Sequence, residues 1–263
     1  MEKKSIEAVM SLFVDRYNRP RKTPLHTSLI QRKLEDKYHP WIVTDILQKL
    51  IKENVLQTKP KKTTYAGEVH FYYSSKLIPT FYSEKEIKGK LKRLSKQIDR
   101  YSHPKNTDLL GRHLHALVRK ELQMHNFLIH SEGNVNSYDG KTWDETGEYL
   151  DIIAEHKQKK LTLGLEIKNT LDPIEKDEVL SKIKMCNYLN ITPVFACRWL
   201  EPYRREMLER GAFPWQFKIQ MYPIGQDRFV EEMQKRFGFP ISVMTELPIG
   251  SVRELENWLF NIN

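Results

Sequence analysis

The chain has 263 residues, of which 40% are apolar and 29% are charged, with 5 Trp, 12 Tyr and 11 Phe. This composition is typical of a globular protein that buries a core, and no apolar run reaches the roughly 18 residues that a membrane span needs, so no membrane partner is expected. The 2 cysteines are too few for a disulfide framework or a cysteine-ligated cluster, and the first residues lack the apolar core of a signal peptide. We therefore expect a cytoplasmic, intracellular protein.

The net charge of +9 is distributed unevenly along the chain. Residues 1–105 contain 23 Lys/Arg and 11 Asp/Glu, whereas residues 106–263 contain 20 and 23. The first part therefore carries +12 and the second part −3. This asymmetry favours a polyanionic partner such as nucleic acid, although a lysine-rich solvated surface would give the same counts.

Residues 1–80 predict three helices followed by a β-hairpin. Apolar residues recur at helical spacing over 4–18, 26–37 and 39–56. Two short strands then flank a basic loop, PKKTTYAG. This order is typical of a winged helix, whose third helix usually enters the major groove of DNA while the hairpin contacts the phosphate backbone. The same fold also mediates protein contacts, and that alternative stays open.

Lysines on the third helix and around the hairpin loop are the candidates for contact with DNA phosphates. They are Lys49, Lys52, Lys59, Lys61 and Lys62. Residues 81–107 then predict a basic helical linker. Its narrow aliphatic stripe, which we expect to dock on another surface, consists of Ile87, Leu91, Leu94 and Ile98.

Residues 108–263 alternate between helical and extended patterns, which predicts an α/β domain with a mixed sheet. The expected elements are a helix over 108–126, extended segments near 127–138, 148–154 and 161–168, a helix over 174–190, a strand over 192–199, a helix near 203–210, a strand near 215–222, a helix near 226–237, the strand PISVMTEL, and a last helix from about 251.

The strand LTLGLEIK ends with Glu166 and Lys168 on the face opposite its leucines. Five Glu-x-Lys triplets occur in the chain, and on the order of one is expected from average composition, so the triplet alone is a weak signal. Four of the five lie on charged helical or loop stretches. The triplet at 166–168 is distinguished because it ends an apolar strand.

A second carboxylate, Asp151, lies in the preceding predicted strand, with Leu150 and Ile152 expected on its opposite face. A hairpin that closes at EHKQKK places Asp151 across from Gly164 or Glu166, and in either register it neighbours Glu166 on one face. Adjacent carboxylates favour a cation, and Mg²⁺ prefers oxygen ligands. An exposed polar face with a cross-strand ion pair is the alternative.

The segments LDIIA and LGLEIKN, followed by a helix and the strand PVFACR, resemble the PD-(D/E)XK nuclease superfamily, which includes many restriction endonucleases and archaeal-type Holliday junction resolvases. The resemblance covers about residues 108–200 and continues more weakly to 263. It implies a restriction-endonuclease-like αβββαβ core and a metal-dependent DNA endonuclease that acts in DNA repair or restriction. The Pro that often precedes the aspartate in this superfamily is lacking here.

The resemblance also implies a role for each residue of the site. Asp151, Glu166 and the main-chain carbonyl of Ile167 would bind Mg²⁺ or Mn²⁺, and Lys168 would assist the attacking water. Resolvase-like members carry a glutamate a few residues after a glycine in the first helix. After Gly111, His115 stands at that offset in this chain.

His115 is therefore the predicted further catalytic and metal-binding residue, whereas the apolar phase of the same helix points instead to Glu121. An imidazole ligand suits ions softer than Mg²⁺, so His115 predicts better activity with Mn²⁺. Both alternatives stay open at this point.

These features together predict a metal-dependent DNA endonuclease with an N-terminal winged helix (1–80), a basic linker (81–107) and a C-terminal nuclease domain (108–263). A homodimer is expected if both DNA strands are cut, and association with the nucleoid is expected in a prokaryote. Two other classes remain open: a DNA-binding regulator with an inactive nuclease-like domain, and an assembly factor that uses the winged helix for protein contacts.

Overall fold

The structure is a computed structural model that describes residues 2–77 and 83–261, which fold into two compact units. Unit 1 contains the chain up to Thr107 together with 231–239, and unit 2 contains 108–230 and the chain from Pro240 onward. The break after Thr107 coincides with the expected start of the second domain. The expected boundary between residues 80 and 81 lies outside the described residues. Within the described ranges, no helix has both the length and the hydropathy to cross a bilayer.

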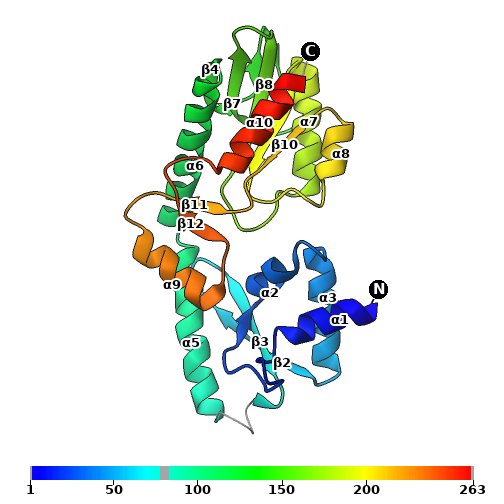
Figure 1. The fold of residues 1–263 in the computed structure, drawn as a ribbon, viewed down its shortest axis with the longest axis vertical. Coiled ribbons are helices and arrows are strands. Elements are labelled where there is room, and N and C mark those ends of the chain that lie inside the picture. Colours follow the sequence, from blue (N-terminus) through cyan, green and yellow to red (C-terminus); the bar gives the residue numbers. More distant parts are fainter. Residues whose placement is uncertain (1, 78–82, 262–263) are drawn as a thin grey trace. The chain divides into compact units, whose positions relative to one another are not determined.

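Unit 1 begins with helices and strands in the order α-β-α-α-β-β, followed by a long helix (Figure 1). Its three-stranded antiparallel sheet has the order β1-β3-β2, and the first three helices pack around a shared apolar core. The elements are α1 (Glu2–Ser11), β1 (Leu25–His26), α2 (Thr27–Leu34), α3 (Pro40–Lys52), β2 (Leu56–Lys62), β3 (Glu68–Ser74) and α5 (Glu84–Tyr101).

Helix α1 ends at Ser11, seven residues before the end that apolar spacing predicts. The cause is a local turn around Asp15, whose Oδ1 accepts hydrogen bonds from the N–H groups of Tyr17 (2.8 Å) and Arg19 (3.1 Å). A short acidic side chain that binds nearby N–H groups competes with the helix for them. Asn18 completes the turn with φ of 57°.

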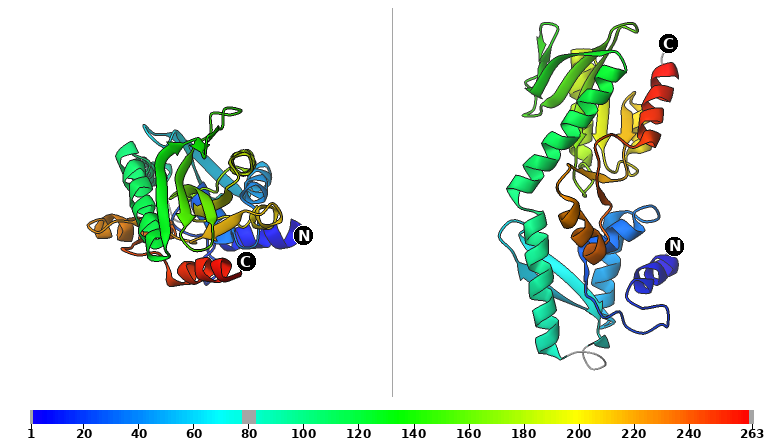
Figure 2. Two further views of the ribbon diagram at one scale, coloured as in Figure 1. Left: turned by 90° about the horizontal axis from the view of Figure 1, so that it is seen from above. Right: turned by 60° about the vertical axis from the view of Figure 1, so that its left-hand side comes forward.

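Helix α5 belongs to unit 1 and lies beside the β2–β3 hairpin, as the right-hand view of Figure 2 shows. The hairpin residue Tyr65 donates its N–H to Asp99 Oδ1 at 2.6 Å. The four aliphatic residues of the predicted stripe are all buried, at 8% exposure or less. The stripe therefore docks as expected, and the segment is an integral part of the unit where a linker was predicted.

Residues 231–239 complete unit 1 from a distant part of the sequence. They include the C-terminal part of α9 (Asp227–Phe237). Gln97 of α5 donates to Glu232 Oε1 at 2.6 Å. The rings of Phe237 and Phe239 stack at 5.3 Å, and both lie against His26. This segment was expected in the second domain, because its helical pattern gives no sign of what it packs against.

Unit 2 is built on a five-stranded mixed sheet of order β10-β9-β8-β7-β4, in which β8, β9 and β10 are parallel and β7 is antiparallel to both of its neighbours. This confirms the predicted α/β class with a mixed sheet. The elements are α6 (Pro104–Met124, which begins before the unit boundary), β4 (Phe127–Val135), β5 (Ser137–Tyr138), β6 (Lys141–Thr142), β7 (Leu150–His156), β8 (Leu161–Lys168), α7 (Lys176–Leu189), β9 (Thr192–Cys197), α8 (Arg204–Glu209), β10 (Phe213–Gln216), β11 (Gln220–Tyr222), β12 (Ile241–Val243) and α10 (Ile249–Asn261).

The single strand expected near 215–222 is two strands that belong to different sheets. Strand β10 pairs with β9, whereas β11 pairs in parallel with β12. Lys218 separates them with φ of 62°, and its N–H is bonded to the Arg198 carbonyl at 2.7 Å. A residue in the left-handed region turns the chain out of an extended path.

Helices cover both faces of the five-stranded sheet. Apolar residues of α6 and α10 pack on the face that carries Leu163 and Leu165, whereas α7 and α8 pack on the face that carries Ile153 and Phe195 (Figure 1). The free cysteines Cys186 and Cys197 are buried on this second face. Helices therefore bury the apolar residues on both faces of the central strands.

Gly164 in the middle of β8 is required by close packing with α7 and its neighbours. A Cβ at this position would lie 2.8 Å from Ile191 Cδ1, 2.8 Å from Leu150 Cδ1 and 2.9 Å from Cys186 Sγ. All three of these side chains are themselves buried. The absence of a side chain at Gly164 thus lets α7 approach β8, two residues before Glu166.

We predict that Gly164→Ala lowers the free energy of unfolding by about 1 to 3 kcal/mol, because overpacking a filled core forces side chains off their preferred rotamers. Urea unfolding of the full chain, followed by tryptophan fluorescence, measures this loss. The matched control is Gly147→Ala, where a Cβ meets no atom within 4 Å. Equal stability of the two variants would contradict the packing account.

Candidate functional site

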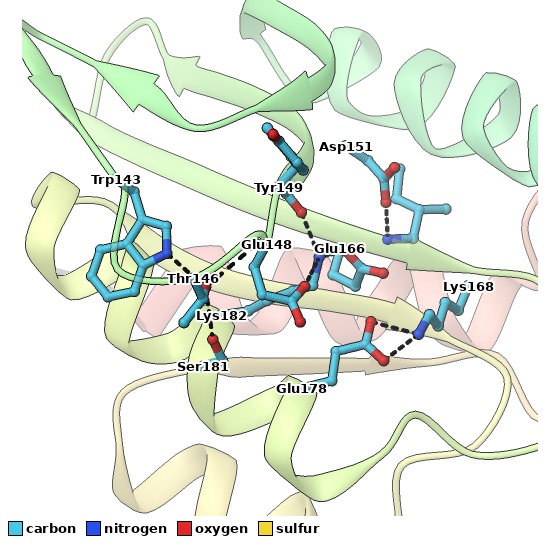
Figure 3. Close-up of polar contacts among 11 residues, drawn as sticks. Trp143, Thr146, Glu148, Tyr149, Asp151, Glu166, Lys168, Glu178, Ser181 and Lys182 are labelled. Atoms are coloured by element: carbon cyan, nitrogen blue, oxygen red, sulfur yellow. Dashed lines mark hydrogen bonds and ion pairs between the residues drawn. The ribbon is translucent and has the colours of Figure 1, made fainter.

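The two predicted carboxylates come together where β7 and β8 stop pairing. The ladder runs from His156↔Leu161 to Ile152↔Leu165 and, if continued, brings Asp151 across from Glu166. Asp151 makes a side-chain contact at this point, because its Oδ2 accepts the N–H of Ile167 at 2.7 Å (Figure 3). A carboxylate thus satisfies a main-chain donor just beyond the last residue pair of the ladder.

Strict alternation fails at the start of β7. Leu150 was expected on the face opposite Asp151, together with Ile152. It packs instead with Ile153 and Met185 on the α7 side of the sheet, while Ile152 lies on the other side. Side-chain direction is fixed by pairing on both sides of a strand, and the β7–β8 pairing ends at Ile152.

The side chain of Asp151 lines a pocket of about 420 Å³ at this end of the sheet. The pocket is also lined by Gly111, Arg112 and His115 of α6 and by Ile167 of β8. The structure therefore brings His115 to the same pocket as Asp151. The pocket thus brings together the carboxylates of Asp151 and Glu132, the His115 imidazole and the Arg112 guanidinium.

Glu121, the alternative helix residue, lies elsewhere, as does the nearby His113 of α6. Glu121 is 5% exposed, as the apolar phase of the helix predicts, and its Oε1 is paired with His125 Nε2 at 3.0 Å. It lines a separate pocket of about 240 Å³ together with Leu117. His113 Nε2 donates to the Met244 carbonyl at 2.8 Å. Of the two alternatives for the helix residue, His115 is the one near Asp151.

Glu166 faces α7, where it meets a buried lysine that sequence reasoning did not select (Figure 3). The Nζ of Lys182 lies 2.5 Å from Glu166 Oε2 and 3.4 Å from Glu148, and it also donates to the Tyr149 carbonyl. The side chain of Lys182 is 6% exposed and that of Glu166 is 8% exposed. The second carboxylate of the site is therefore already neutralised by a cation of the protein.

Lys168 is paired with the same helix. Its Nζ donates to both carboxylate oxygens of Glu178. Glu178 and Lys182 are four residues apart on α7, and Glu166 and Lys168 are two apart on β8. Each charged residue of the strand thus pairs with an oppositely charged residue of the helix, and these two adjacent ion pairs hold β8 against α7.

The electrostatics of the site follow from burial and from these neighbours. Burial and the nearby Asp151 carboxylate raise the pKa of Glu166 to about 7, although Lys182 acts in the opposite direction. Burial also raises the pKa of Asp151, against the hydrogen bond from Ile167 and the positive charge of Lys182. Burial alone would lower the pKa of Lys182, but its carboxylate partners raise it overall. Lys182 therefore remains a cation while Glu166 titrates near neutrality.

Asn169, which follows the Glu-x-Lys triplet, holds the end of β8 in place. Its Nδ2 donates to the carbonyls of Leu110 (2.9 Å) and Met221 (2.7 Å), and its Oδ1 accepts the Met221 N–H at 2.9 Å. The side chain is buried and has hydrogen bonds at both ends. This residue ties β8 to α6 and β11, and its role is structural.

The five lysines predicted to contact DNA lie on α3 and on β2 of unit 1. Lys49 and Lys52 are exposed in the last turn of α3. Strand β2 extends to Lys62, so Lys61 and Lys62 are strand residues rather than loop residues. They pair across the hairpin with Val69 and Glu68. The loop itself is reduced to 63–67.

Three further charged residues complete the site: Lys182, Glu178 and Glu148. Of these, only Lys182 could have been selected from the sequence. Lys182 lies within the apolar phase of α7, next to Val179 and Ile183. A lysine at a buried phase indicates a buried ionic partner, because an isolated buried ammonium is too costly. Which carboxylate it meets depends on the packing of α7 against β8.

The donor set of the site fits a hard divalent cation. The carboxylates of Asp151 and Glu166 and the Ile167 carbonyl are oxygen ligands, and Mg²⁺ is commonly held by one or two carboxylates together with waters and phosphate oxygens. Within the described ranges, no three His, Cys, Asp or Glu side chains gather as a metal cluster. A cation would therefore retain water as part of its coordination.

Comparisons with protein-family models, curated proteins and solved structures found no match to this chain. Functional conclusions therefore depend on the residues and the geometry described above.

We predict that Glu166 makes the chain less stable as the pH rises from about 4.5 to about 7. Over this interval the folded chain retains a proton that the unfolded chain has released, because the pKa of Glu166 is raised from 4.5 to about 7. The shift corresponds to a stability difference on the order of 3 kcal/mol. Urea unfolding in EDTA at pH 5 and pH 8 should show a larger loss for the wild type than for Glu166→Gln. Parallel losses would contradict the prediction.

Removing Lys182 should destabilise unit 2 strongly, because Glu166 then lacks its buried cation. At pH 8 we expect Lys182→Met to cost about 3 kcal/mol or more, and Lys182→Met/Glu166→Gln to recover much of that loss. Tryptophan fluorescence during unfolding follows mainly unit 2, which holds four of the five tryptophans, whereas Trp41 lies in unit 1.

Lys184→Met is the matched control for this prediction. Lys184 lies two residues further along α7, its side chain is 66% exposed, and it pairs with Glu145, which is 51% exposed. Exposed pairs contribute little, so its loss should change stability by about 0.5 kcal/mol at most. A Lys184 variant as damaged as the Lys182 variant would contradict the account.

Proposed function

We propose that this chain is a metal-dependent DNA endonuclease. The observation that carries the proposal is that Asp151, bonded to the Ile167 main chain, lies close enough to Glu166 to affect its ionisation, beside a pocket that His115 also lines. Apart from the two-residue strands β5 and β6, the order α6, β4, β7, β8, α7, β9 follows the αβββαβ pattern expected from the sequence resemblance, which supports the proposal. The donor set and the element order both support this assignment.

Each residue then has a chemical task. Asp151, Glu166 and the carbonyl of Ile167 would hold Mg²⁺ or Mn²⁺, which when bound would activate water and neutralise charge on the phosphate. Lys168 would orient the attacking water or take its proton. Glu178 positions Lys168, and Lys182 positions Glu166. His115 would act as a further ligand or as a phosphate contact at the pocket wall.

Unit 1 would supply affinity for DNA. Its first six elements follow the helix and strand order of a winged helix, with α3 as the helix expected to enter the major groove. Exposed Lys49 and Lys52 lie in the last turn of α3. These features support DNA as the substrate and are consistent with the +12 charge of residues 1–105.

One observation favours a second candidate, a DNA-binding regulator whose nuclease-like unit does not cut. Glu166 and Lys168 are both engaged by α7, so the charges of the site are balanced by the protein itself. Nuclease activity requires that the Glu166–Lys182 pair yields to a bound cation. The two candidates differ in whether the protein nicks DNA when a metal is supplied.

The test is a cleavage assay of the full chain with Mg²⁺ or Mn²⁺ on labelled duplex, branched and single-stranded DNAs. We predict EDTA-sensitive cleavage that falls by about 100-fold or more in Asp151→Asn, Glu166→Gln and Lys168→Met, because each change removes a ligand or the group that serves the water. DNA binding in EDTA should stay close to the wild-type value. Cleavage that is equal in the wild type and all three variants would reject this site.

Glu155, a carboxylate on the same strand as Asp151, provides the control. Glu155 lies on β7 and pairs with His130 at 2.8 Å, away from the pocket of Asp151. Glu155→Gln should cut at nearly the wild-type rate. Comparison of His115→Ala with Glu121→Gln tests the helix residue: loss of cleavage in the Glu121 variant alone would contradict the assignment of His115.

A further inference from the structure

A second pocket, distinct from the carboxylate site, lies wholly within unit 1. Its volume is about 510 Å³, which is in the range of ligand-binding sites. It is formed by the loop before β1, by α2 and α5, and by the end of the 231–239 segment. Figure 1 shows α2, α5 and α9, the helices that contribute to its walls. None of the lysines assigned to DNA contact above lines this pocket.

The lining is cationic around an apolar floor. The floor is made by Leu25, Leu29 and Leu94, which are buried. No aspartate or glutamate is among the lining residues. The cations that line the pocket are Arg21, Lys33, Lys90, Arg93, Lys235 and Arg236. Like charges that gather around one space repel each other, so the arrangement favours an anion within it.

Some of these cations bind other groups of the protein, and others do not. Arg21 donates to the Leu12 carbonyl at 3.2 Å, and Arg236 lies 3.4 Å from Glu232. By contrast, Lys33, Arg93 and Lys235 are exposed and form no hydrogen bond or ion pair with any residue that the structure describes. These three side chains come from three separate segments, α2, α5 and α9, yet they surround the same pocket.

We infer that this pocket binds phosphate groups of the DNA backbone, as a contact surface separate from α3 and the β2–β3 hairpin. The inference rests on the proposed function in that DNA is the partner. Lys and Arg without carboxylate neighbours are the usual ligands of backbone phosphates, whereas a splayed-out base is usually held by stacking on an aromatic ring. The lining offers no aromatic ring, and Gln234 is its one amide side chain among six cations. The contact therefore adds affinity without sequence preference.

The test is equilibrium binding of the full chain to labelled duplex DNA in EDTA over a range of salt concentrations. Lys33→Gln/Arg93→Gln/Lys235→Gln should bind at least about tenfold more weakly at low salt, and the slope of log K against log salt should fall by up to about 3, one for each lost phosphate contact. A charge-conserving variant, Lys33→Arg/Arg93→Lys/Lys235→Arg, should bind like the wild type. Wild-type affinity and slope in the neutral variant would overturn the inference.

A control of equal charge comes from another side of α5. Lys85, Lys88 and Lys92 are exposed and do not line the pocket. Their replacement by Gln should reduce affinity clearly less than the pocket variant does. If both triple variants lose the same affinity and slope, net charge rather than the pocket explains binding, and the inference fails.

Two further arms separate the sources of anionic charge. ATP and poly-glutamate are titrated by calorimetry at constant ionic strength into the wild type and the neutral variant. If the neutral variant loses affinity for either one but keeps wild-type DNA affinity, the pocket serves a small phosphorylated ligand or an acidic protein, and the DNA assignment is overturned. Because all binding is measured without divalent metal, a chain that binds DNA through the pocket but never cuts would refute only the proposed endonuclease.

Discussion

The ammonium group of Lys182 is the constraint on which the candidate site depends. A buried cation is tolerated only when carboxylates and carbonyls replace its water, and here they come from three places: Glu166 at the end of β8, Glu148 before β7, and the Tyr149 carbonyl. These contacts fix the distance between α7 and the sheet. They also leave Gly164 as the position where a side chain has no room.

Because of Lys182, the carboxylates of Asp151 and Glu166 lie in different environments. Asp151 points to a pocket and is held by a main-chain donor, whereas Glu166 points to a helix and is held by a cation. Such a pair is able to serve two purposes. One member can meet a ligand from solution, and the other can be released only by competition with an internal charge.

Sequence reasoning succeeded where structure is determined locally. The period-2 alternation over 161–168 predicted β8 with its observed bounds, and the polar turn before it placed Asp151 near Glu166 through hairpin geometry. It failed where a distant segment decides. Leu150 changes side because the pairing of β7 with β8 ends at Ile152. The early end of α1 is different, because its cause is the local turn at Asp15, which apolar spacing does not reveal.

The sequence likewise did not predict the α7 residues that pair with the site or the residues that line the cationic pocket. Lys182 and Glu178 meet β8 only through tertiary packing, and their spacing on the helix names no partner. Lys33, Arg93 and Lys235 are separated in sequence by up to about two hundred residues, and no local pattern relates them. Burial phase can indicate that a charged residue is enclosed, but not what encloses it.

The return of residues 231–239 to unit 1 has a consequence for synthesis of the chain. A ribosome adds about 5 to 20 residues per second, so roughly 7 to 26 s separate the emergence of Thr107 from that of the segment that completes the unit. During this interval His26 lacks its partners Phe237 and Phe239, and the cationic pocket lacks one wall. Although unit 1 begins at the N-terminus, it is finished only after most of unit 2 has been made.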